Sequence, residues 1–308
     1  MQAEVLRSRL AELLGFAVPP VPELLVHAER ERDGYVEQVV SYKGVEGDVP
    51  ALLLVPERPC GAGVLVLHQH NSRWHLGKSE VAGLAGEPLQ AFGPALARAG
   101  IVVLAPDAVG FEDRRHSDPG IDEREDDWLQ YFNEMAYRLL AGRLLITTVL
   151  GDGACGLSVL IADERIEDLR VGVLGHSYGG NVTLMLAALD ERVRFACASG
   201  SACSYRQRML DRTGIEFAHV IPGILELTDI GQLVELIAPR PLLLLSATED
   251  RYSADTPQIV KVAARAYREA GAPQALEHHR AQGGHALTRE RFDAIIDWVL
   301  AQLGGRPR

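Results

Sequence analysis

The stretch VGVLGHSYGG, residues 171–180, joins a short apolar run to a serine flanked by glycines and leads directly into a second apolar run at 181–189. A strand, a sharp turn and a helix around G-x-S-x-G are typical of a serine that is exposed at the end of a sheet strand. Side chains at Gly175 and Gly179 would collide with the strand or the helix, and the turn strains the serine backbone. We therefore predict that Ser177 projects its Oγ at the carboxyl edge of a sheet, beside a helix N-terminus that favours negative charge.

The composition is that of a globular protein with an excess of acid. The 308 residues include 31 Lys and Arg, 42 Asp and Glu and only 4 Cys, giving a formal net charge of −11, and 47% of them are hydrophobic. The apolar fraction is too high for a disordered chain, and the acidic balance argues against a nucleic-acid partner. The cysteines form no CxxC pair that would indicate a disulfide framework or a zinc site. No apolar run of about 18 residues indicates a membrane span and no export signal is evident, so we expect no membrane partner and a cytoplasmic location.

Apolar runs without alternation recur along the chain, as in strands that are buried on both faces. They lie at 64–67, 101–105, 171–174, 193–198 and 242–245, and a last strand is expected at 275–280. Stretches of helical character lie at 89–99, 126–150, 181–189, 257–270 and 289–303. This alternation predicts an α/β fold with a mostly parallel central sheet and helices on both faces.

The remaining segments are interpreted as additions to this core, within a single domain over 1–308. Residues 1–34 are predicted as an N-terminal helical extension that begins with a helix over 1–16. The short runs 35–42 and 49–55 predict an antiparallel hairpin. Segment 203–236 interrupts the alternation of strand and helix, and we interpret it as a small cap over an acyl pocket. Its apolar residues suit an apolar ligand, although ordinary packing explains most of them as well.

A serine nucleophile needs a general base, which is expected after it in the chain in this type of fold. The histidines that follow Ser177 are His219, His278, His279 and His285. His278 and His279 lie inside the last strand, whereas His285 follows it in a glycine-rich loop that can bring an imidazole to the sheet edge. We therefore predict His285 as the base.

The base in turn needs an orienting carboxylate, which should follow the preceding parallel strand. Glu249 and Asp250 both follow the run 242–245. Asp250 is favoured because the later position reaches further over the sheet edge, and Glu249 is the neighbour that could substitute for it. Asp107 precedes the serine and is expected to fix a turn instead.

Acyl transfer also requires backbone N–H donors for the tetrahedral oxygen. We predict one donor at Tyr178, directly after the serine, and a second at Gln69, in the loop after the run 64–67. The side chains expected to border the substrate pocket are His68, His70, His176 and Ile221.

Four histidines before the serine offer a metal site as an alternative. The candidate ligands are His68, His70, His75 and His116, and His-x-His places two rings on one face of a strand. No further ligand follows at a convincing spacing, and the loop already has a role in holding the oxyanion. We therefore predict neither a metal nor another cofactor.

With these elements in order, the chain resembles the α/β-hydrolase superfamily, and within it the dienelactone-hydrolase-like and acetyl xylan esterase-like esterases. The resemblance covers roughly residues 35–300. The stretches that carry it are LHQHN at 67–71, GKSE at 77–80, APD at 105–107, GHSYGG at 175–180, IPG at 221–223 and LIAPRPLL at 236–243. Dienelactone hydrolase itself carries a cysteine nucleophile, so Ser177 argues against dienelactone as the substrate. Lys78 and Glu80 recur in such sequences, and we expect a structural ion pair under the oxyanion loop.

The resemblance and the residues together predict a serine hydrolase that cleaves a carboxylic ester of a small molecule through an acyl-enzyme on Ser177. A lactonase, a thioesterase or a peptidase would use the same residues. An acyltransferase, a C–C bond hydrolase and a non-catalytic binding protein are the further alternatives on this fold. No pattern in the sequence indicates an oligomeric state.

Overall fold

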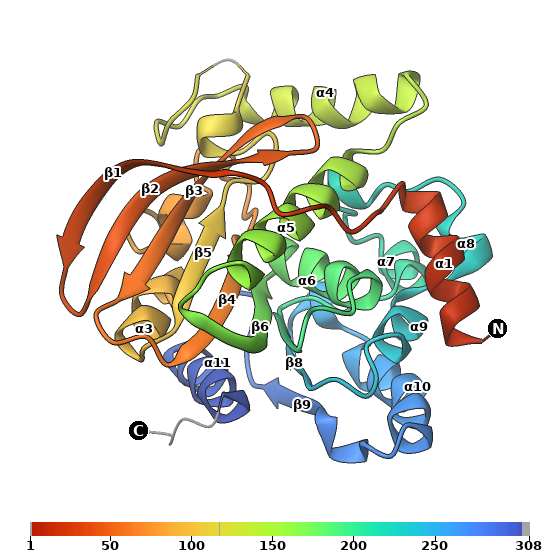
Figure 1. Ribbon diagram of the computed structural model, residues 1–308. Helices are drawn as coiled ribbons and strands as arrows, with labels where there is room; N and C mark the ends of the chain where they lie inside the picture. Colours follow the sequence, from red (N-terminus) through yellow and green to blue (C-terminus); the bar gives the residue numbers. More distant parts are fainter. Residues whose placement is uncertain (1, 117, 304–308) are drawn as a thin grey trace.

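The computed structural model describes residues 2–116 and 118–303, and a nine-stranded sheet runs through them in the order β1-β2-β3-β5-β4-β6-β7-β8-β9 (Figure 1). Its strands are β1 (Leu24–Arg32), β2 (Tyr35–Gly44), β3 (Gly47–Pro56), β4 (Gly61–Leu67), β5 (Val102–Pro106), β6 (Ile166–His176), β7 (Phe195–Ser199), β8 (Leu242–Ala247) and β9 (Leu276–Ala281). The pairs from β1 to β3 and the pair β3–β5 are antiparallel, and all pairs from β5 to β9 are parallel. The predicted mostly parallel sheet is confirmed.

Helices cover both faces of the sheet because the central strands are apolar on both sides. In β4, Val64 and Val66 pack into one buried cluster, together with α3 (Phe92–Arg98) and α11 (Arg289–Gln302). The alternate residues Leu65 and Leu67 pack into the opposite cluster. That cluster includes α1 (Ala3–Leu14), α5 (Leu145–Ile161), α6 (Tyr178–Leu189), α9 (Ile230–Glu235) and α10 (Thr256–Glu269). Strands buried on both faces therefore explain the unbroken apolar runs in the sequence.

The N-terminal extension differs from the prediction. A helix does form near the start, at α1, and it buries Leu6, Leu10 and Leu14. Residues 24–32, however, form the edge strand β1 rather than continuing a helical extension. β1 adds a third antiparallel strand to the predicted hairpin of β2 and β3 and leaves most of its own side chains exposed.

The helix predicted over 126–150 is two helices, α4 (Asp127–Leu140) and α5. The break lies at Gly142, whose φ of 69° is left-handed and ends the first helix. In the described part of the chain no single helix is long and apolar enough to cross a bilayer. Only α4 and α5 taken together reach that length and composition, and they are bent by 106° relative to each other.

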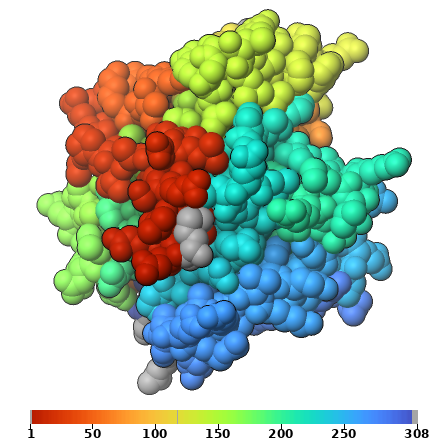
Figure 2. Space-filling view, turned by 90° about the vertical axis from the view of Figure 1, so that its right-hand side faces the viewer, coloured from red at the N-terminus to blue at the C-terminus, as the bar shows by residue number. Residues whose placement is uncertain are grey.

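Segment 203–236 lies at the carboxyl edge of the sheet. It contains α7 (Tyr205–Asp211), a 3₁₀ turn at Phe217–His219, α8 (Ile224–Leu227) and α9. Figure 2 shows this segment in teal against the N-terminal residues in red, in agreement with the contact between α8 and α1. The described short elements are α2 (Lys78–Val81) and the 3₁₀ turns Pro88–Gln90, Glu112–Arg114, Arg251–Ser253 and Pro273–Ala275.

Candidate active site

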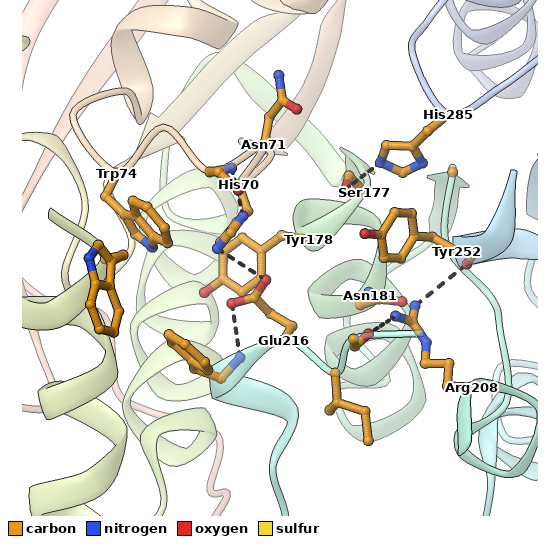
Figure 3. Close-up of a pocket in the computed structure, with 16 residues that line it drawn as sticks. His70, Asn71, Trp74, Ser177, Tyr178, Asn181, Arg208, Glu216, Tyr252 and His285 are labelled. Atoms are coloured by element: carbon orange, nitrogen blue, oxygen red, sulfur yellow. Dashed lines mark hydrogen bonds and ion pairs between the residues drawn. The ribbon is translucent and has the colours of Figure 1, made fainter. Parts of the chain in front are cut away.

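Three side chains from separate loops form a continuous hydrogen-bonded chain at the carboxyl edge of the sheet. Ser177 lies between β6 and α6, and its Oγ is 2.8 Å from Nε2 of His285 (Figure 3). The other ring nitrogen, Nδ1, is 3.0 Å from Oδ1 of Asp250. Because an ionised carboxylate only accepts hydrogen bonds, Nδ1 carries the proton and Nε2 is left to accept from the serine hydroxyl. The structure thus brings together the three residues predicted as nucleophile, base and acid.

The turn around Ser177 depends on close backbone packing. Ser177 has a φ of 57°, in the left-handed region that is strained for a residue with a side chain. A Cβ on Gly175 would lie 2.2 Å from the carbonyl carbon of Gly179, and a Cβ on Gly179 would lie 2.1 Å from the carbonyl oxygen of Leu67. Both glycines are therefore required by backbone atoms that cannot move aside, as the sequence predicted.

Asp250, and not Glu249, contacts the histidine. Glu249 is exposed, and only its backbone N–H is engaged, at 2.9 Å from the carbonyl of Gly283. Burial alone would raise the pKa of Asp250, but hydrogen bonds from His285, the Ser253 hydroxyl and the Tyr252 N–H hold it below its usual value. Asp250 therefore stays ionised at neutral pH.

A buried arginine, which the sequence analysis missed, holds the loop that carries His285. Arg291, in the first turn of α11, is 2% exposed. Its guanidinium donates to the carbonyl oxygens of Gly284, His285 and Ala286 at 2.9, 3.1 and 3.0 Å. Nothing in the sequence distinguishes Arg291 from a surface arginine at the start of a helix.

A cavity of about 450 Å³ opens beside Ser177 (Figure 3). Its aromatic walls are Trp74, Trp128, Tyr178, Phe217 and Tyr252, and its polar lining includes His70, Asn71, Asn181, Arg208 and Glu216. The cavity therefore has flat apolar surfaces that alternate with hydrogen-bonding groups.

Comparison with known proteins bears on the fold of the chain. No protein-family model matches the chain. The chain is 29% identical over 294 residues to the Bacillus subtilis (strain 168) protein named "Putative hydrolase YtaP", covering 92% of this chain and 93% of that one. Among solved structures it resembles the "putative acetyl xylan esterase (BF1801)" of Bacteroides fragilis NCTC 9343, with a TM-score of 0.73, 17% identity and coverage of 90% of this chain and 74% of the other. The chain has the α/β-hydrolase fold. A glucuronoyl esterase from Solibacter usitatus shares it, with a TM-score of 0.69, 16% identity and coverage of 96% and 92%.

On this α/β-hydrolase fold, the predicted pocket residues divide into one that lines the cavity and three that do not. His70 lines it. His68 is buried beneath the loop, where its Nδ1–H donates to the Gln69 carbonyl and its Nε2 accepts from the Ala108 N–H. His176 is fully buried behind the triad, 3.1 Å from the Ser199 hydroxyl. Ile221 is 5% exposed and packs into the core. The prediction was wrong for these three because their side chains point into the protein.

Most apolar residues of the cap segment do not line the cavity. Of its apolar residues only Ile215 and Phe217 line the cavity, whereas Met209 and Leu210 are 57% and 78% exposed. The cap segment instead contributes two charged side chains, Arg208 and Glu216.

Glu216 is held at the cavity wall by its neighbours. It accepts a hydrogen bond from the Phe217 N–H at 3.0 Å, and its other oxygen is 3.5 Å from Nε2 of His70. Burial raises the pKa of Glu216 to about 7 and lowers the pKa of His70 to about 4. His70 is therefore neutral at pH 7, so its contact with Glu216 is a polar contact rather than an ion pair.

The loop that carries Gln69 adjoins the start of α6. The carbonyls of Leu67 and His68 lie directly against Gly179, so the predicted oxyanion donors, the N–H groups of Gln69 and Tyr178, belong to adjoining backbone segments. The Gln69 side chain donates to Glu80 at 3.0 Å, which ties the loop to α2. Their role as oxyanion donors remains a prediction.

Lys78 and Glu80 do not pair with each other, contrary to expectation. The Lys78 ammonium donates to Asp107 at 2.7 Å, to Glu112 at 2.5 Å and to Asp113 at 2.7 Å. Asp107 also accepts from the backbone N–H groups of Lys78 and Asp113, so it fixes a turn as predicted. Within residues 2–116 and 118–303 these three acids are the one group spaced to hold a metal ion, and Lys78 places its ammonium among them.

The four histidines weighed as metal ligands have separate surroundings. His75 lies 3.8 Å from Asp127, and His116 contacts Glu134, whereas His68 and His70 have the partners given above. Of the other histidines after Ser177, His278 bonds the Ser246 hydroxyl at 2.8 Å, and both ring nitrogens of the buried His219 lack a described partner.

A second hollow, of about 630 Å³, also borders His285. It shares Asn71 and His285 with the first cavity. Its remaining lining consists of Gln69, Glu87, Pro88, Leu89, Gln90, Ala286 and Leu287. His285 therefore borders both hollows, whereas Ser177 lines only the first.

Proposed function

We propose that this chain is a serine hydrolase that cleaves a carboxylic ester of a small, polar molecule through an acyl-enzyme on Ser177. The observation that carries the proposal is the unbroken chain Asp250–His285–Ser177, whose hydroxyl opens into the cavity. A serine with an accepting imidazole and an ionised carboxylate behind it is the arrangement that activates a hydroxyl for acyl transfer.

In the first half of the reaction, Oγ of Ser177 attacks the ester carbonyl carbon while Nε2 of His285 takes the hydroxyl proton. Asp250 holds the ring through Nδ1 and stabilises the imidazolium. The N–H groups of Tyr178 and Gln69 receive the negative charge on the tetrahedral oxygen. The intermediate then expels the alkoxide, which takes the proton from His285 and leaves as the alcohol.

In the second half, water attacks the acyl-enzyme. His285 removes a proton from the water, the tetrahedral intermediate forms again, and Ser177 leaves with that proton as the carboxylic acid is released. Every step uses water and groups of this chain.

The character of the cavity supports a polar substrate such as a carbohydrate ester. Two tryptophans, Trp74 and Trp128, provide flat faces, and Asn71 and Asn181 provide hydrogen-bonding amides at the same cavity. Pockets of this size, lined by aromatic surfaces and a few placed polar groups, bind small organic ligands. The acetyl xylan esterase and the glucuronoyl esterase that share the fold are named for carbohydrate esters, which agrees with this substrate class.

The test uses a Ser177→Ala variant and short 4-nitrophenyl esters. We expect Ser177→Ala to lose hydrolysis by about 10³-fold or more, since removal of the nucleophile leaves only binding and polarisation. Ser8→Ala, at an exposed position of α1, serves as the control. A fluorophosphonate should label the wild type at Ser177, as read by mass spectrometry. Hydrolysis by Ser177→Ala within tenfold of the wild type would refute the proposal.

A further inference from the structure

Arg208 places a buried guanidinium in the wall of the cavity that contains Ser177. The residue lies on α7 of the cap segment and is 7% exposed. Its hydrogen-bond acceptors are three backbone carbonyls, those of Cys203 at 3.5 Å, Gly214 at 3.0 Å and Tyr252 at 3.5 Å. Figure 3 shows the guanidinium below the Tyr252 ring and beside Asn181. Arg208 therefore faces the cavity from the side of the cap.

No carboxylate of the described residues lies within ion-pair distance of the Arg208 guanidinium. Among the ion pairs formed within 2–116 and 118–303, none includes Arg208. Two of its three carbonyl contacts are at 3.5 Å, the outer limit of hydrogen-bond distance, so they compensate the charge only weakly. A charge removed from water without a counter-charge is costly, and an anion that enters the cavity would relieve that cost.

We propose that Arg208 binds a carboxylate group of the substrate, so that the preferred ester carries a free carboxylate besides the ester bond. This rests on the proposed function, since the carboxylate is located relative to Ser177. A guanidinium presents five N–H donors in a planar fork that matches the two oxygens of a carboxylate, and three of them are engaged with the carbonyls. The volume of about 450 Å³ leaves room for a small organic acid beside the nucleophile.

The acid in the same cavity does not occupy this position. Glu216 is turned to the Phe217 N–H and to His70, and it forms no ion pair with Arg208. The guanidinium of Arg208 thus has carbonyl acceptors but no carboxylate at ion-pair distance, whereas the Glu216 carboxyl has its own hydrogen-bond partner in the Phe217 N–H.

The experiment compares matched pairs of esters in which one member carries a free carboxylate and the other a neutral group at the same position. On the acyl side, 4-nitrophenyl hydrogen adipate is compared with 4-nitrophenyl hexanoate. On the alcohol side, 4-acetoxybenzoate is compared with 4-acetoxybenzamide. In at least one pair we expect kcat/KM of the wild type to favour the carboxylate by about 10-fold to 100-fold, the range expected for a hydrogen bond to a charged group.

Variants then test whether Arg208 is the cause. Arg208→Met should bring that ratio to about one, and Arg208→Lys, which keeps the charge without the fork, should give an intermediate ratio. Arg206→Met is the matched control, because Arg206 lies on the same helix, is 66% exposed and is absent from this cavity. Its ratio should equal that of the wild type.

A measurement without any variant guards against misfolding of Arg208→Met. Adipate should inhibit wild-type hydrolysis of the neutral ester about tenfold more strongly than adipamide does. Equal inhibition, together with ratios near one in both substrate pairs, would overturn the proposal and leave Arg208 as a structural tie between three carbonyls. If that result is obtained while Ser177→Ala abolishes hydrolysis, only the inference about Arg208 is refuted. If hydrolysis instead survives in Ser177→Ala, the proposed function is refuted.

Discussion

The guanidinium of Arg291 donates a hydrogen bond to the carbonyl oxygen of His285 at 3.1 Å, and its second terminal nitrogen bonds the carbonyls on either side of that residue. The guanidinium of Arg291 therefore fixes the backbone of the loop that carries His285. Gly283, with a φ of 106°, gives the same loop a backbone conformation that favours glycine. Arg291 touches none of the reacting atoms, so it is a positioning residue.

We expect Arg291→Met to lower kcat by about 10-fold to 100-fold with a smaller change in KM, because a displaced base costs rate more than binding. Arg291→Lys should recover part of kcat. The measurement is steady-state kinetics together with the pH profile of kcat, which should change shape if His285 moves relative to Asp250. A loss of thermal stability with kcat unchanged would show that Arg291 only stabilises α11.

The pair Asp250 and Glu249 offers a test of the acid. Asp250→Asn keeps the shape but removes the charge behind His285, and its amide favours the wrong tautomer of the ring. We expect kcat/KM to fall by about 10³-fold to 10⁴-fold. Glu249→Gln, at the exposed neighbouring position, should stay within about twofold, as for an ordinary surface change. Equal losses in both variants, measured on the same ester, would contradict the assignment.

The buried ammonium of Lys78 should matter for stability. Its three carboxylate neighbours hold its pKa above the usual value, so it is charged, and Lys78→Met would leave Asp107, Glu112 and Asp113 facing one another. We expect a loss of about 3–5 kcal/mol in the free energy of unfolding. Lys43→Met, which removes a surface pair with Asp48, should cost at most about 1 kcal/mol.

The loss of unfolding free energy caused by Lys78→Met should also depend on pH. Burial, followed by the charge of Glu112, raises the pKa of Asp107 to about 7. The folded state therefore binds more protons than the unfolded state between the ordinary carboxyl range and pH 7, so stability falls as pH rises through that window. Lys78 lowers the pKa of Asp107, so without Lys78 this fall is larger, and the loss of stability in Lys78→Met grows as pH rises. Urea unfolding of the wild type and Lys78→Met at pH 6 and pH 8 measures this difference in unfolding free energy. A larger difference at pH 6 than at pH 8 would contradict the prediction.

Glu216 should make the preference for carboxylate esters depend on pH. Its pKa of about 7 means that Glu216 gains a negative charge between pH 6 and pH 8, while His70 stays neutral. The carboxylate-to-neutral ratio of kcat/KM should therefore fall by about threefold to tenfold over this range. In Glu216→Gln this ratio should not change with pH. The control is Glu226→Gln, at an exposed position of α8, in which the ratio should change with pH as in the wild type. A ratio that rises with pH would count against this.

The residues of the triad could be predicted because each follows an apolar strand of the parallel sheet, where the carboxyl ends converge. Ser177 adds the glycine turn, and Asp250 and His285 follow β8 and β9. Arg291, Arg208 and Glu216 could not be predicted, since no sequence pattern shows that these charged side chains are buried or which backbone groups they contact. The same holds for Lys78, whose partners come from the loop after β5 rather than from its own helix.

Two parts of the fold were missed for a related reason. The sequence of β1 is LLVHAERER, which has too few apolar residues to indicate a strand. It is extended because its backbone pairs with that of β2. The glycine-containing run at 151–156 continues α5. The helix packs so closely there that a side chain would not fit, as at Gly156 against Tyr42. Tertiary packing overrides the local preference of glycine at these positions.

The two outermost strands of the sheet have a property in common that bears on association rather than on catalysis. β1 carries Glu29, Arg30, Glu31 and Arg32, and β9, at the opposite end, carries Glu277, His278, His279 and Arg280. An unpaired strand edge is a template on which another chain can add a strand, and charged side chains along it oppose such growth. A nine-stranded sheet with an interior as apolar as this one thus ends, on both sides, in strands that discourage aggregation.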